Sequence, residues 1–552
     1  MQLLDILTIL LFAAGILCTG LLFVKRGKNL KSFFAAGGSV PWQINGLSLF
    51  MGFFSAGTFV VWGSIAYSLG WVSVTIQWTM AVAGFLVGLF VAPRWHRTGV
   101  LTVAEYITRR LGLTTQKAYT YLFLFISLFT TGAFLYPVAR IVEVSTGLPL
   151  SACVLLLGGV CILYVAAGGL WAVVVTDVLQ FIILTAAVVI VVPLAFDKVG
   201  GVGAFIESVP AQFFDCLNGE YTVGFVVAFG IYNAIFLGGN WAYVQRYTSV
   251  RNGRDACRVG CLFGGLYLIS PILWMLPPML YRVFDPSLSG LESEGAYLLM
   301  CKEALPVGLL GMMLGGMIFA TASSLNSTLN ISSGVFTNDI FRRLAPARLA
   351  ENDRVLIRVA RLSTLVFGVL AIIVALLVPL MGGIVNVVIS VAALTGVPLY
   401  LPVIWTLFSK RQTGISVLTT TLLSLAVNAL FKFVTPLAGF SLDRAEEMML
   451  GVGFPAVVLL CFELWYALRG RESEGYLRYK ALEAECAREK ETVAETKPVH
   501  SDDNRFSIRV IGTGIALTGL VIVLLGFAAD HGRIMVFSTG AALILLGGWI
   551  RR

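Results

Sequence analysis

Charged side chains are scarce in this sequence. Asp, Glu, Lys and Arg make up 12% of its 552 residues, whereas a soluble protein has about 25%. Hydrophobic residues make up 58% and the mean hydropathy is +0.88, so the chain cannot be a set of soluble domains. The formal net charge of +9 does not indicate nucleic-acid binding, because the basic residues collect at the ends of apolar runs. The composition is that of a polytopic membrane protein.

The residues on which most enzymes and metal sites depend are also few. The chain has three histidines, and it contains no recognisable Ser/His/Asp set, zinc cluster or Walker loop, which leaves little basis for an intramembrane hydrolase or an ATP-driven pump. The nine cysteines contain no CxxC pair, so they indicate no metal site. Cys216 and Cys301 fall in or beside segments that we place on the outer side, where they either pair or stay free. We predict no enzymatic activity and no cofactor.

Apolar runs of about 20 residues, the length that crosses a bilayer, recur about fifteen times along the chain. The first, Leu3–Val24, has no small-residue cleavage site, so we expect a retained helix and not a signal peptide. The predicted spans are 3–24, 42–69, 71–93, 119–146, 148–168, 171–195, 221–245, 258–282, 304–337, 357–380, 384–408, 414–434, 449–468, 508–528 and 534–550.

Lys and Arg collect in the loops that follow odd-numbered spans, such as KRGKNLKSFF at 25–34 and QRYTSVRNGRDACR at 245–258. The positive-inside rule therefore places the N-terminus outside and the C-terminus in the cytoplasm, in the plasma (inner) membrane. Residues 469–507 are rich in Glu, Lys and Arg. We interpret them as a cytoplasmic linker, either a solvated tether or a regulatory docking segment, that is too short for an enzyme domain.

The ninth span contains a polar stripe within an apolar run. Ser, Thr and Asn are frequent in Met312–Phe336, and no charged residue occurs before Asp339. Hydrocarbon offers a lone hydroxyl no partner, so such a stripe faces protein, water or an ion. Ser323 and Ser324 supply adjacent hard oxygens, and Ala320 lies one turn earlier. The stripe indicates a cation site, or serines that bond the carbonyls four residues back in their own helix.

The second span is rich in small residues. Gly46, Gly52 and Gly57 weaken a helix, each by about 1 kcal/mol relative to alanine. A break near Met51–Ser55 would free backbone carbonyls at membrane depth, where they are tolerated only if they line a cavity or bind something. Close helix packing through small residues is the alternative.

Asp177 stands in the apolar run GGLWAVVVTDVLQFIIL. A carboxylate there is costly unless it is paired or lines a water path. We interpret Asp177 as part of a cation exit route or second cation site, or as an interfacial residue that caps local backbone.

Amides in two other spans are candidates for solute contact. Asn240 lies deep in the seventh span, whereas Gln245 and Arg246 are expected to mark its cytoplasmic boundary. Gln77 and Trp78 pair an amide with an aromatic ring in the third span, an arrangement that sugar and zwitterion sites use but that also occurs elsewhere.

Five stretches resemble a known family in content and order. They are FFAAGGSVPWQINGLSLF, RTGVLTVAEYITRRLG, GGLWAVVVTDVLQ, NWAYVQR and ATASSLNSTLN…TNDIFRRL, and together they span roughly residues 32–410. In these motifs the chain resembles the sodium/solute symporter family, which includes sodium-coupled sugar, sialic acid, proline and pantothenate carriers.

The resemblance implies an all-α polytopic membrane protein with an inverted-repeat core of five plus five helices, in which the first helix of each repeat is discontinuous. The implied organisation is a peripheral N-terminal helix (1–30), a transport core (40–410) with repeats at 42–195 and 221–408, peripheral helices (411–468), the charged linker (469–507), and two additional transmembrane helices (508–552).

The resemblance also implies site residues. The main sodium site of the family corresponds to the hydroxyls of Ser323 and Ser324 and to the carbonyls of Ala320, Met51 and Phe54. A second sodium site found in some members corresponds to Asp177, Ser323, Asn326 and Ser327, where Asn326 replaces the usual serine. Solute contacts correspond to Gln77, Trp78, Asn240, Thr58 and Phe53. The lysine that sugar carriers place in the eighth span is missing from residues 258–280.

We therefore predict a sodium-coupled secondary active symporter that imports a small polar organic solute by alternating access, with a sugar or sugar derivative favoured. Its partners are the solute, sodium and the lipid bilayer, with sodium as coupling ion and protons as the alternative. An amino acid or organic acid is the alternative solute. A symporter-like membrane sensor and a channel are alternatives of another class.

Overall fold

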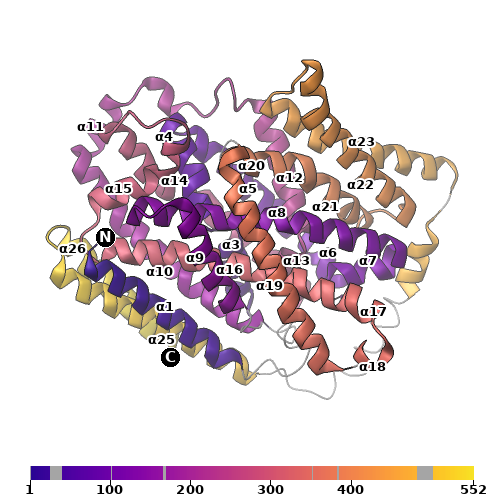
Figure 1. Cartoon of the computed structure of the whole chain (residues 1–552), viewed down its shortest axis with the longest axis horizontal. Helices are drawn as coiled ribbons and strands as arrows, with labels where there is room; N and C mark the ends of the chain where they lie inside the picture. Colours follow the sequence, from indigo (N-terminus) through magenta and orange to yellow (C-terminus); the bar gives the residue numbers. More distant parts are fainter. Residues whose placement is uncertain are drawn as a thin grey trace.

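The computed structural model of the chain describes residues 2–24, 40–100, 102–165, 170–350, 352–381, 384–470, 472–481 and 501–551. Within these ranges the regular structure is entirely helical and no strand occurs (Figure 1). The all-α fold predicted from the sequence is confirmed.

The first part of the chain, up to residue 214, covers the first predicted repeat (42–195) and the helices on either side of it. The α-helices are α1 (Leu3–Val24), α3 (Trp42–Phe53), α4 (Gly63–Leu69), α5 (Val72–Leu86), α6 (Ala92–Arg97), α7 (Val103–Leu111), α8 (Leu113–Thr146), α9 (Leu150–Val165), α10 (Leu170–Val199) and α11 (Gly201–Ser208). Short π-helices at Thr58–Trp62 and Val87–Val91 join α-helices, and a 3₁₀ turn covers Ala211–Phe214.

The rest of the described chain, from residue 223, is also helical. Its α-helices are α12 (Val223–Gly239), α13 (Trp241–Thr248), α14 (Gly253–Phe284), α15 (Ala296–Ala304), α16 (Leu309–Val335), α17 (Arg342–Leu344), α18 (Ala347–Ala350), α19 (Asp353–Leu377), α20 (Ile384–Val391), α21 (Val397–Thr406), α22 (Gly414–Ala429), α23 (Arg444–Leu468), α25 (Ser501–Ala528) and α26 (Arg533–Arg551). The remaining turns are π-helices at Phe336–Phe341, Ala392–Gly396 and Leu430–Val434 and 3₁₀ turns at Gly290–Gly295, Val378–Met381 and Thr435–Ala438.

Among the described residues, ten helices are long and apolar enough to cross a membrane, or up to twelve if each of two bent pairs counts as one span. The three other predicted spans contain shorter apolar helices, at Leu3–Ile16, Leu150–Gly159 and Leu309–Thr321. The predicted count of about fifteen spans is therefore approximate, while each predicted run coincides largely with helix in the residues that the structure describes.

The helix of the second span is broken where the sequence predicts it. α3 ends at Phe53, and Phe54 adopts an extended conformation with φ −91° and ψ 111°. Helix resumes at Thr58, and the two halves are bent by 59°. Because Phe54 leaves the helical region, the carbonyls around the break are released from the i→i−4 ladder.

A second break lies in the seventh span. α12 ends at Gly239, Asn240 is extended with φ −63° and ψ 130°, and α13 begins at Trp241. The bend is 60°, close to that of the second span. The two first helices of the predicted repeats are thus both discontinuous, as the resemblance implies.

Close backbone contact between intact helices occurs where α5 crosses α14. A Cβ atom added at Gly84 would lie 2.7 Å from the Cα of Gly264, and one added at Gly260 would lie 2.4 Å from the Cα of Gly88. Side chains at these glycines would separate the two helices. The small residues of α5 and α14 therefore serve packing.

The turn between α14 and α15 is fastened to two other helices. The Glu294 carboxylate accepts hydrogen bonds from the backbone N–H of Ile384, the first residue of α20, at 3.1 Å and from the hydroxyl of Tyr136 on α8 at 3.1 Å. Burial raises the pKa of Glu294, and the two hydrogen bonds oppose that rise. Glu294 thus couples this turn to the start of α20.

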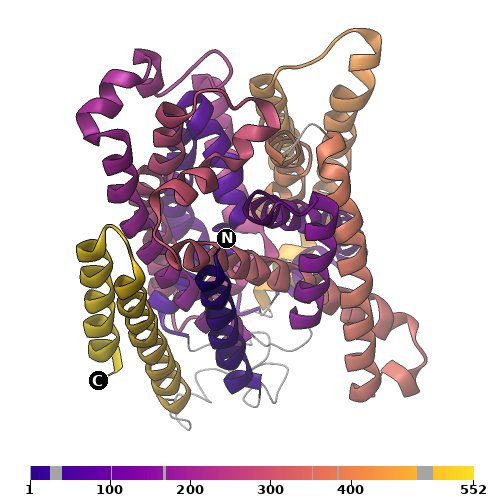
Figure 2. The same cartoon turned by 60° about the vertical axis from the view of Figure 1, so that its left-hand side comes forward.

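The C-terminal helices α25 and α26 form a hairpin at the edge of the bundle (Figure 2). Their backbones approach closely, since a Cβ atom at Gly519 would lie 2.6 Å from the carbonyl oxygen of Gly540. Ile511 and Ile515 of α25 pack with Val175 and Leu179 of α10. Both helices are long and apolar enough to cross a membrane.

The charged segment 469–507 differs from a uniformly solvated tether. Its residues 474–481 are helical, and the hydroxyl of Ser473 accepts a hydrogen bond from Arg110 of α7 at 3.3 Å. Residues 482–500 lie outside the described residues, and 501–507 belong to α25. The first part of the segment is therefore docked against the helical bundle.

The cysteine pairing left open by the sequence does not occur. Cys216 and Cys301 are both free, the former exposed and the latter buried.

Candidate ion- and solute-binding site

The break after α3 is fastened directly to α16. The backbone N–H of Ala56 donates a 2.8 Å hydrogen bond to the hydroxyl oxygen of Thr321, and that hydroxyl donates in turn to the carbonyl of Met317 at 3.0 Å. Ala56 and Thr321 are both fully buried. Thr321 follows Ala320 directly, so this hydrogen bond brings the polar stripe of α16 to the interrupted backbone of the second span.

Ala320 and Ser324 lie together on the buried face of α16. The hydroxyl of Ser324 donates to the carbonyl of Ala320 at 3.4 Å, which is a long bond between neutral oxygens. Serine bonding to the carbonyl four residues back, one of the two interpretations of the sequence, is therefore present at Ser324. The backbones of Ser323, Asn326 and Ser327 belong to α16, but their side chains lie outside the described residues.

Met51 and Phe54 bracket the end of α3. The carbonyl of Met51 accepts from the backbone N–H of Phe54 at 3.2 Å, and both side chains are buried. The backbone carbonyls of these two residues are neutral hard oxygens in an apolar surrounding. Oxygens of this kind are the ligands that a small hard cation prefers.

Asp177 joins both discontinuous helices. Its carboxylate oxygen Oδ2 accepts a 2.6 Å hydrogen bond from the hydroxyl of Ser48 on α3 and lies 3.9 Å from Nη2 of Arg246 on α13. Asp177 is 1% exposed and Arg246 is 3% exposed. Both side chains are therefore buried within the protein, where the guanidinium of Arg246 faces the carboxylate of Asp177.

Phe53 and Thr58 lie on the two sides of the first break. Phe53 stacks on Tyr243 of α13 with ring centroids 4.4 Å apart, and the Tyr243 hydroxyl donates to the carbonyl of Gly52 at 3.3 Å. The Thr58 hydroxyl accepts from the N–H of Ser55 at 3.3 Å. Further rings contact Phe53, namely those of Phe236 and Phe263. We call Phe53, Phe236, Tyr243 and Phe263 the aromatic cluster.

Asn240 stabilises the second break. Its Oδ1 accepts from the N–H of Ala242 at 2.9 Å, which caps α13, and its Nδ2 donates to the hydroxyl of Tyr400 at 3.4 Å. The Tyr400 ring in turn lies 5.5 Å from the ring of Phe236, in the aromatic cluster. Asn240 is thus half-buried at the rim of that cluster.

The structure separates Gln77 from Trp78. Gln77 is buried and donates to its own helix, at the carbonyl of Ser73. The Trp78 indole N–H donates to the carbonyl of Leu268 at 3.0 Å, and the Leu268 side chain is exposed. Trp78 therefore lies on the face of the α5–α14 pair that points away from the protein core. The structure does not bring it to the breaks after α3 and α12.

The sequence reasoning missed Thr321, Arg246, Tyr243 and Asn233. Asn233 of α12 is fully buried, donates to the hydroxyl of Thr79 at 2.8 Å, and has an Oδ1 atom with no hydrogen-bond partner. An amide inside an apolar run was a signal available for Asn233, since buried polar groups are normally paired. No local signal marked Tyr243, because its role arises from stacking across two helices.

Comparison with known proteins agrees with this architecture. The sequence model of the sodium:solute symporter family matches residues 33–423. The chain is 28% identical over 513 residues to the sodium/glucose cotransporter of Vibrio parahaemolyticus, covering 85% of this chain and 92% of that protein. It is 27% identical over 409 residues to sodium/glucose cotransporter 1 of Ovis aries, covering 66% of this chain but only 61% of the sheep protein.

Solved structures share the fold. A Na⁺-coupled sialic acid symporter, in a substrate-bound outward-open state, superposes with a TM-score of 0.71 at 20% identity, covering 85% of this chain and 98% of that one. The nucleobase-cation-symport-1 family transporter Mhp1, in a closed conformation, gives a TM-score of 0.52 at 15% identity, with coverage of 82% and 99%. The inverted-repeat transporter fold thus extends over most of the chain. Since the family model matches well over half of its residues, the chain belongs to the sodium:solute symporter family.

Proposed function

We propose that this protein is a sodium-coupled symporter that imports a small polar organic solute by alternating access. The observation that carries the proposal is the buried hydrogen bond from Ala56 to Thr321. It holds the interrupted backbone of the second span against the stretch of α16 that contains Ala320, Ser323 and Ser324. Family membership and the sodium-coupled relatives support the choice of coupling ion.

Sodium would bind between the two elements. The proposed ligands are the hydroxyls of Ser323 and Ser324 and the carbonyls of Ala320, Met51 and Phe54. Because these oxygens are neutral, the ion brings the only full charge to the site, and its binding draws α3 and α16 together. Inward sodium movement then supplies about 2.3 kcal/mol per 100 mV of membrane potential, in addition to the concentration gradient.

Coupling follows from linkage. If sodium fixes the orientation of the broken helix, it also fixes Phe53 and Thr58, which lie at the same break. Whatever affinity sodium adds for the solute, the solute must add for sodium. A single break that contributes to both sites is therefore a simple physical link between ion and solute.

Asp177 is proposed to lie on the cation exit path or at a second sodium site with Ser323, Asn326 and Ser327. The pairing of Asp177 with Arg246 supports a path over a permanently filled second site. A carboxylate whose charge is already balanced by a guanidinium gains less free energy from binding a sodium ion than an unpaired carboxylate does.

A sugar or sugar derivative is the favoured solute. The aromatic cluster offers ring faces beside Thr58 and Asn240, which can donate and accept hydrogen bonds, and this combination suits a polyhydroxylated ring. The sodium/glucose cotransporters among the relatives agree with it. An amino acid or organic acid is the alternative. Gln77 contributes only if it exchanges its bond to Ser73, and Trp78 is the weakest of the original candidates.

The proposed topology follows the charge pattern, with the N-terminus outside, the C-terminus cytoplasmic, and a core from about residue 40 to 410 in the plasma membrane. Peripheral helices 411–468, the segment 469–507 and the hairpin within 508–552 complete the chain. The docking of 472–481 against α7 favours a positioned segment over a free tether.

Thermal unfolding of the purified protein tests the function most simply. A panel of sugars, sialic acids, amino acids and carboxylates is measured in sodium and in potassium, since a ligand that binds only the native state stabilises it. A solute that stabilises only in sodium supports symport. Stabilisation that is equal in both salts argues against sodium coupling. Currents that do not saturate with solute would favour the channel alternative.

A further inference from the structure

A cavity of about 200 Å³ lies where α6, α7 and the end of α21 meet the segment 472–481. Five of the residues that line it carry positive charge, and none of its lining residues is acidic. The cationic residues are Arg94, Arg97, Arg110, Lys410 and Lys480. We propose that this cavity binds a phosphate group, supplied by an anionic lipid headgroup or by a free phosphate compound.

Arg110 is the buried centre of the cavity. It is 1% exposed, and it donates to the carbonyl of Ser409 at 3.1 Å and to the hydroxyl of Ser473 at 3.3 Å. Its Nε atom has no hydrogen-bond partner. Burial lowers the pKa of Arg110, which shows the cost of removing the cation from water. Neutral oxygens compensate that cost only in part, so a buried guanidinium of this kind favours an anion.

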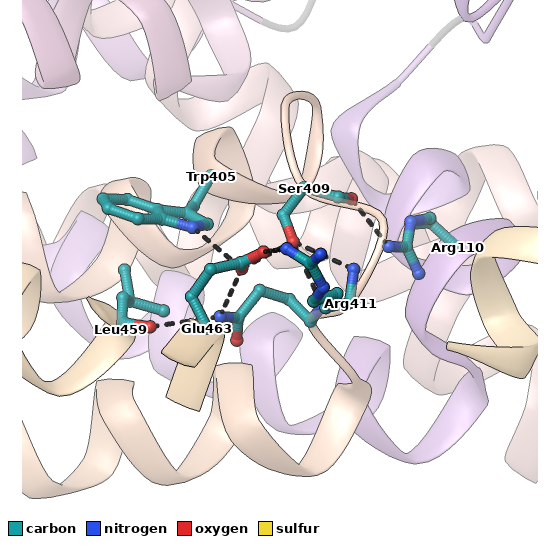
Figure 3. Close-up of polar contacts among 7 residues, drawn as sticks. Arg110, Trp405, Ser409, Arg411, Leu459 and Glu463 are labelled. Carbon is teal, nitrogen blue, oxygen red and sulfur yellow. Dashed lines mark hydrogen bonds and ion pairs between the residues drawn. The ribbon is translucent and has the colours of Figure 1, made fainter. Parts of the chain in front are cut away.

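The carboxylate of Glu463, whose charge acts on Arg110, already has other partners. Glu463 of α23 accepts hydrogen bonds from the hydroxyl of Ser409 at 2.7 Å and from Gln412 at 3.0 Å, and it pairs with Arg411 at 3.3 Å. Figure 3 shows Ser409 between Arg110 on one side and Glu463 on the other. Ser409 thus separates the two charges, and Glu463 does not enter the cavity lining.

The other charged residues in the cavity lining are also positive. On α7, Glu105 pairs with Arg109, four residues away, so that helix adds no free carboxylate. Arg94 lies over the ring of Phe408 with its Cζ 4.2 Å from the centroid. Arg97 and Lys410 are exposed at the cavity mouth. Several cations around hydroxyl groups are the chemistry that recognises a phosphate, because arginine bonds two of its oxygens at once.

The location favours a headgroup as the source. The membrane-length helix Val72–Arg97 ends at the cavity, so Arg97 lies at the depth where a span leaves the hydrocarbon. Basic pockets at this depth on the cytoplasmic side attract anionic headgroups. Since the cavity also contains the docked residues Tyr476 and Tyr479, its ligand would hold the segment 472–481 against the transport core. This inference is independent of which solute is transported.

The full-length protein, delipidated in a neutral detergent, provides the test. Its thermal unfolding is titrated with inorganic phosphate, with short-chain phosphatidylglycerol and with short-chain phosphatidylcholine. We expect stabilisation by phosphatidylglycerol, by phosphate or by both, and none by phosphatidylcholine. A response to the lipid alone identifies the headgroup as the source, and a response to phosphate alone identifies a free phosphate compound.

Matched variants locate the response. Arg97→Gln with Lys410→Gln removes two exposed cavity charges, and Arg251→Gln with Arg254→Gln removes two exposed arginines at the start of α14, outside the cavity. The cavity variant should bind about tenfold more weakly, as expected for the loss of charge-assisted contacts, and the control variant should bind like the wild type. If the cavity variant does not fold, Arg97→Gln alone replaces it, with a smaller loss expected. Equal stabilisation by phosphatidylcholine, or an undiminished response in the cavity variant, overturns the proposal.

Discussion

The backbone N–H of Ala56 donates a 2.8 Å hydrogen bond to the hydroxyl of Thr321, which ties the break of the second span to the serine-rich helix α16. Thr321→Val removes the acceptor while keeping the shape of the side chain. A buried N–H left without a partner costs about 1–3 kcal/mol. We expect the sodium concentration for half-maximal uptake to rise about tenfold, as measured in proteoliposomes.

Thr364→Val is the matched control for Thr321→Val. Thr364 on α19 is also buried, but its hydroxyl bonds only the carbonyl of Ala360 in its own helix. Its sodium dependence should stay at the wild-type value. If both variants behave alike, the link from α3 to α16 has no special part in sodium binding.

The pair Asp177 and Arg246 gives a second prediction. Asp177→Asn leaves the Arg246 guanidinium buried without its carboxylate, and removing one partner of a buried pair costs about 3–5 kcal/mol. The unfolding temperature should therefore fall strongly. The double variant Asp177→Asn with Arg246→Gln removes both charges and should recover most of that stability.

Measurements of uptake distinguish a role of Asp177 on the cation path from a purely structural role. If the carboxylate lies on the cation path, the double variant stays inactive although it is stable again. Recovery of stability and uptake together would show that Asp177 has only a structural role. An unaltered unfolding temperature in the Asp177→Asn single variant would contradict the buried pair itself.

Substitutions of Phe53 and of Trp78 should differ in their effect on the KM for the solute. Phe53 stacks in the aromatic cluster at the break, whereas Trp78 bonds to the carbonyl of Leu268 on the outer side of α14. Phe53→Leu should raise the KM for the solute about tenfold, since an aromatic contact contributes about 0.5–1.5 kcal/mol beyond its buried area. Trp78→Leu should leave KM near the wild-type value. A larger rise in KM for Trp78→Leu than for Phe53→Leu would instead place the solute on the face of α5 that carries Trp78.

The raised pKa of Glu294 predicts that the stability of the protein depends on pH. Burial raises the pKa of this carboxyl, so the folded protein holds its proton more tightly than the unfolded chain does. The resulting stabilisation is complete below the unfolded pKa and is lost as pH rises through the higher folded pKa. The unfolding temperature of the wild type, measured relative to that of Glu294→Gln, should therefore fall as pH rises above about 4.5. A difference that does not change with pH would contradict the raised pKa.

Much of the fold could be predicted from the sequence because each span is specified locally. Run length and hydropathy define the helices. Gly52 and Gly57, with small polar residues between them, weaken the second span at the place where the structure breaks it. The charged segment after α23 was also evident, but the sequence did not decide between a tether and a docked segment, because docking depends on Arg110, a residue far away in the sequence.

The site was less predictable because its decisive contacts join distant segments. The pairing of Arg246 depends on Asp177, which is on another helix, and the charge pattern along the sequence does not reveal it. Gln77 and Trp78 are neighbours in sequence, but neighbours in a helix point about 100° apart. Only packing against α14 decides which of them faces outward.

The central claim is that sodium binds between the paired serines of α16 and the interrupted backbone of α3. Sodium-stimulated uptake and the sodium-dependent rise in unfolding temperature are measured for Ser323→Ala with Ser324→Ala. The control is Ser332→Ala with Ser333→Ala, an adjacent pair further along the same helix where Ser332 bonds Ser127 of α8. We predict that the first variant is folded but loses both responses to sodium, while the control keeps them. Wild-type sodium stimulation in the first variant would contradict the account.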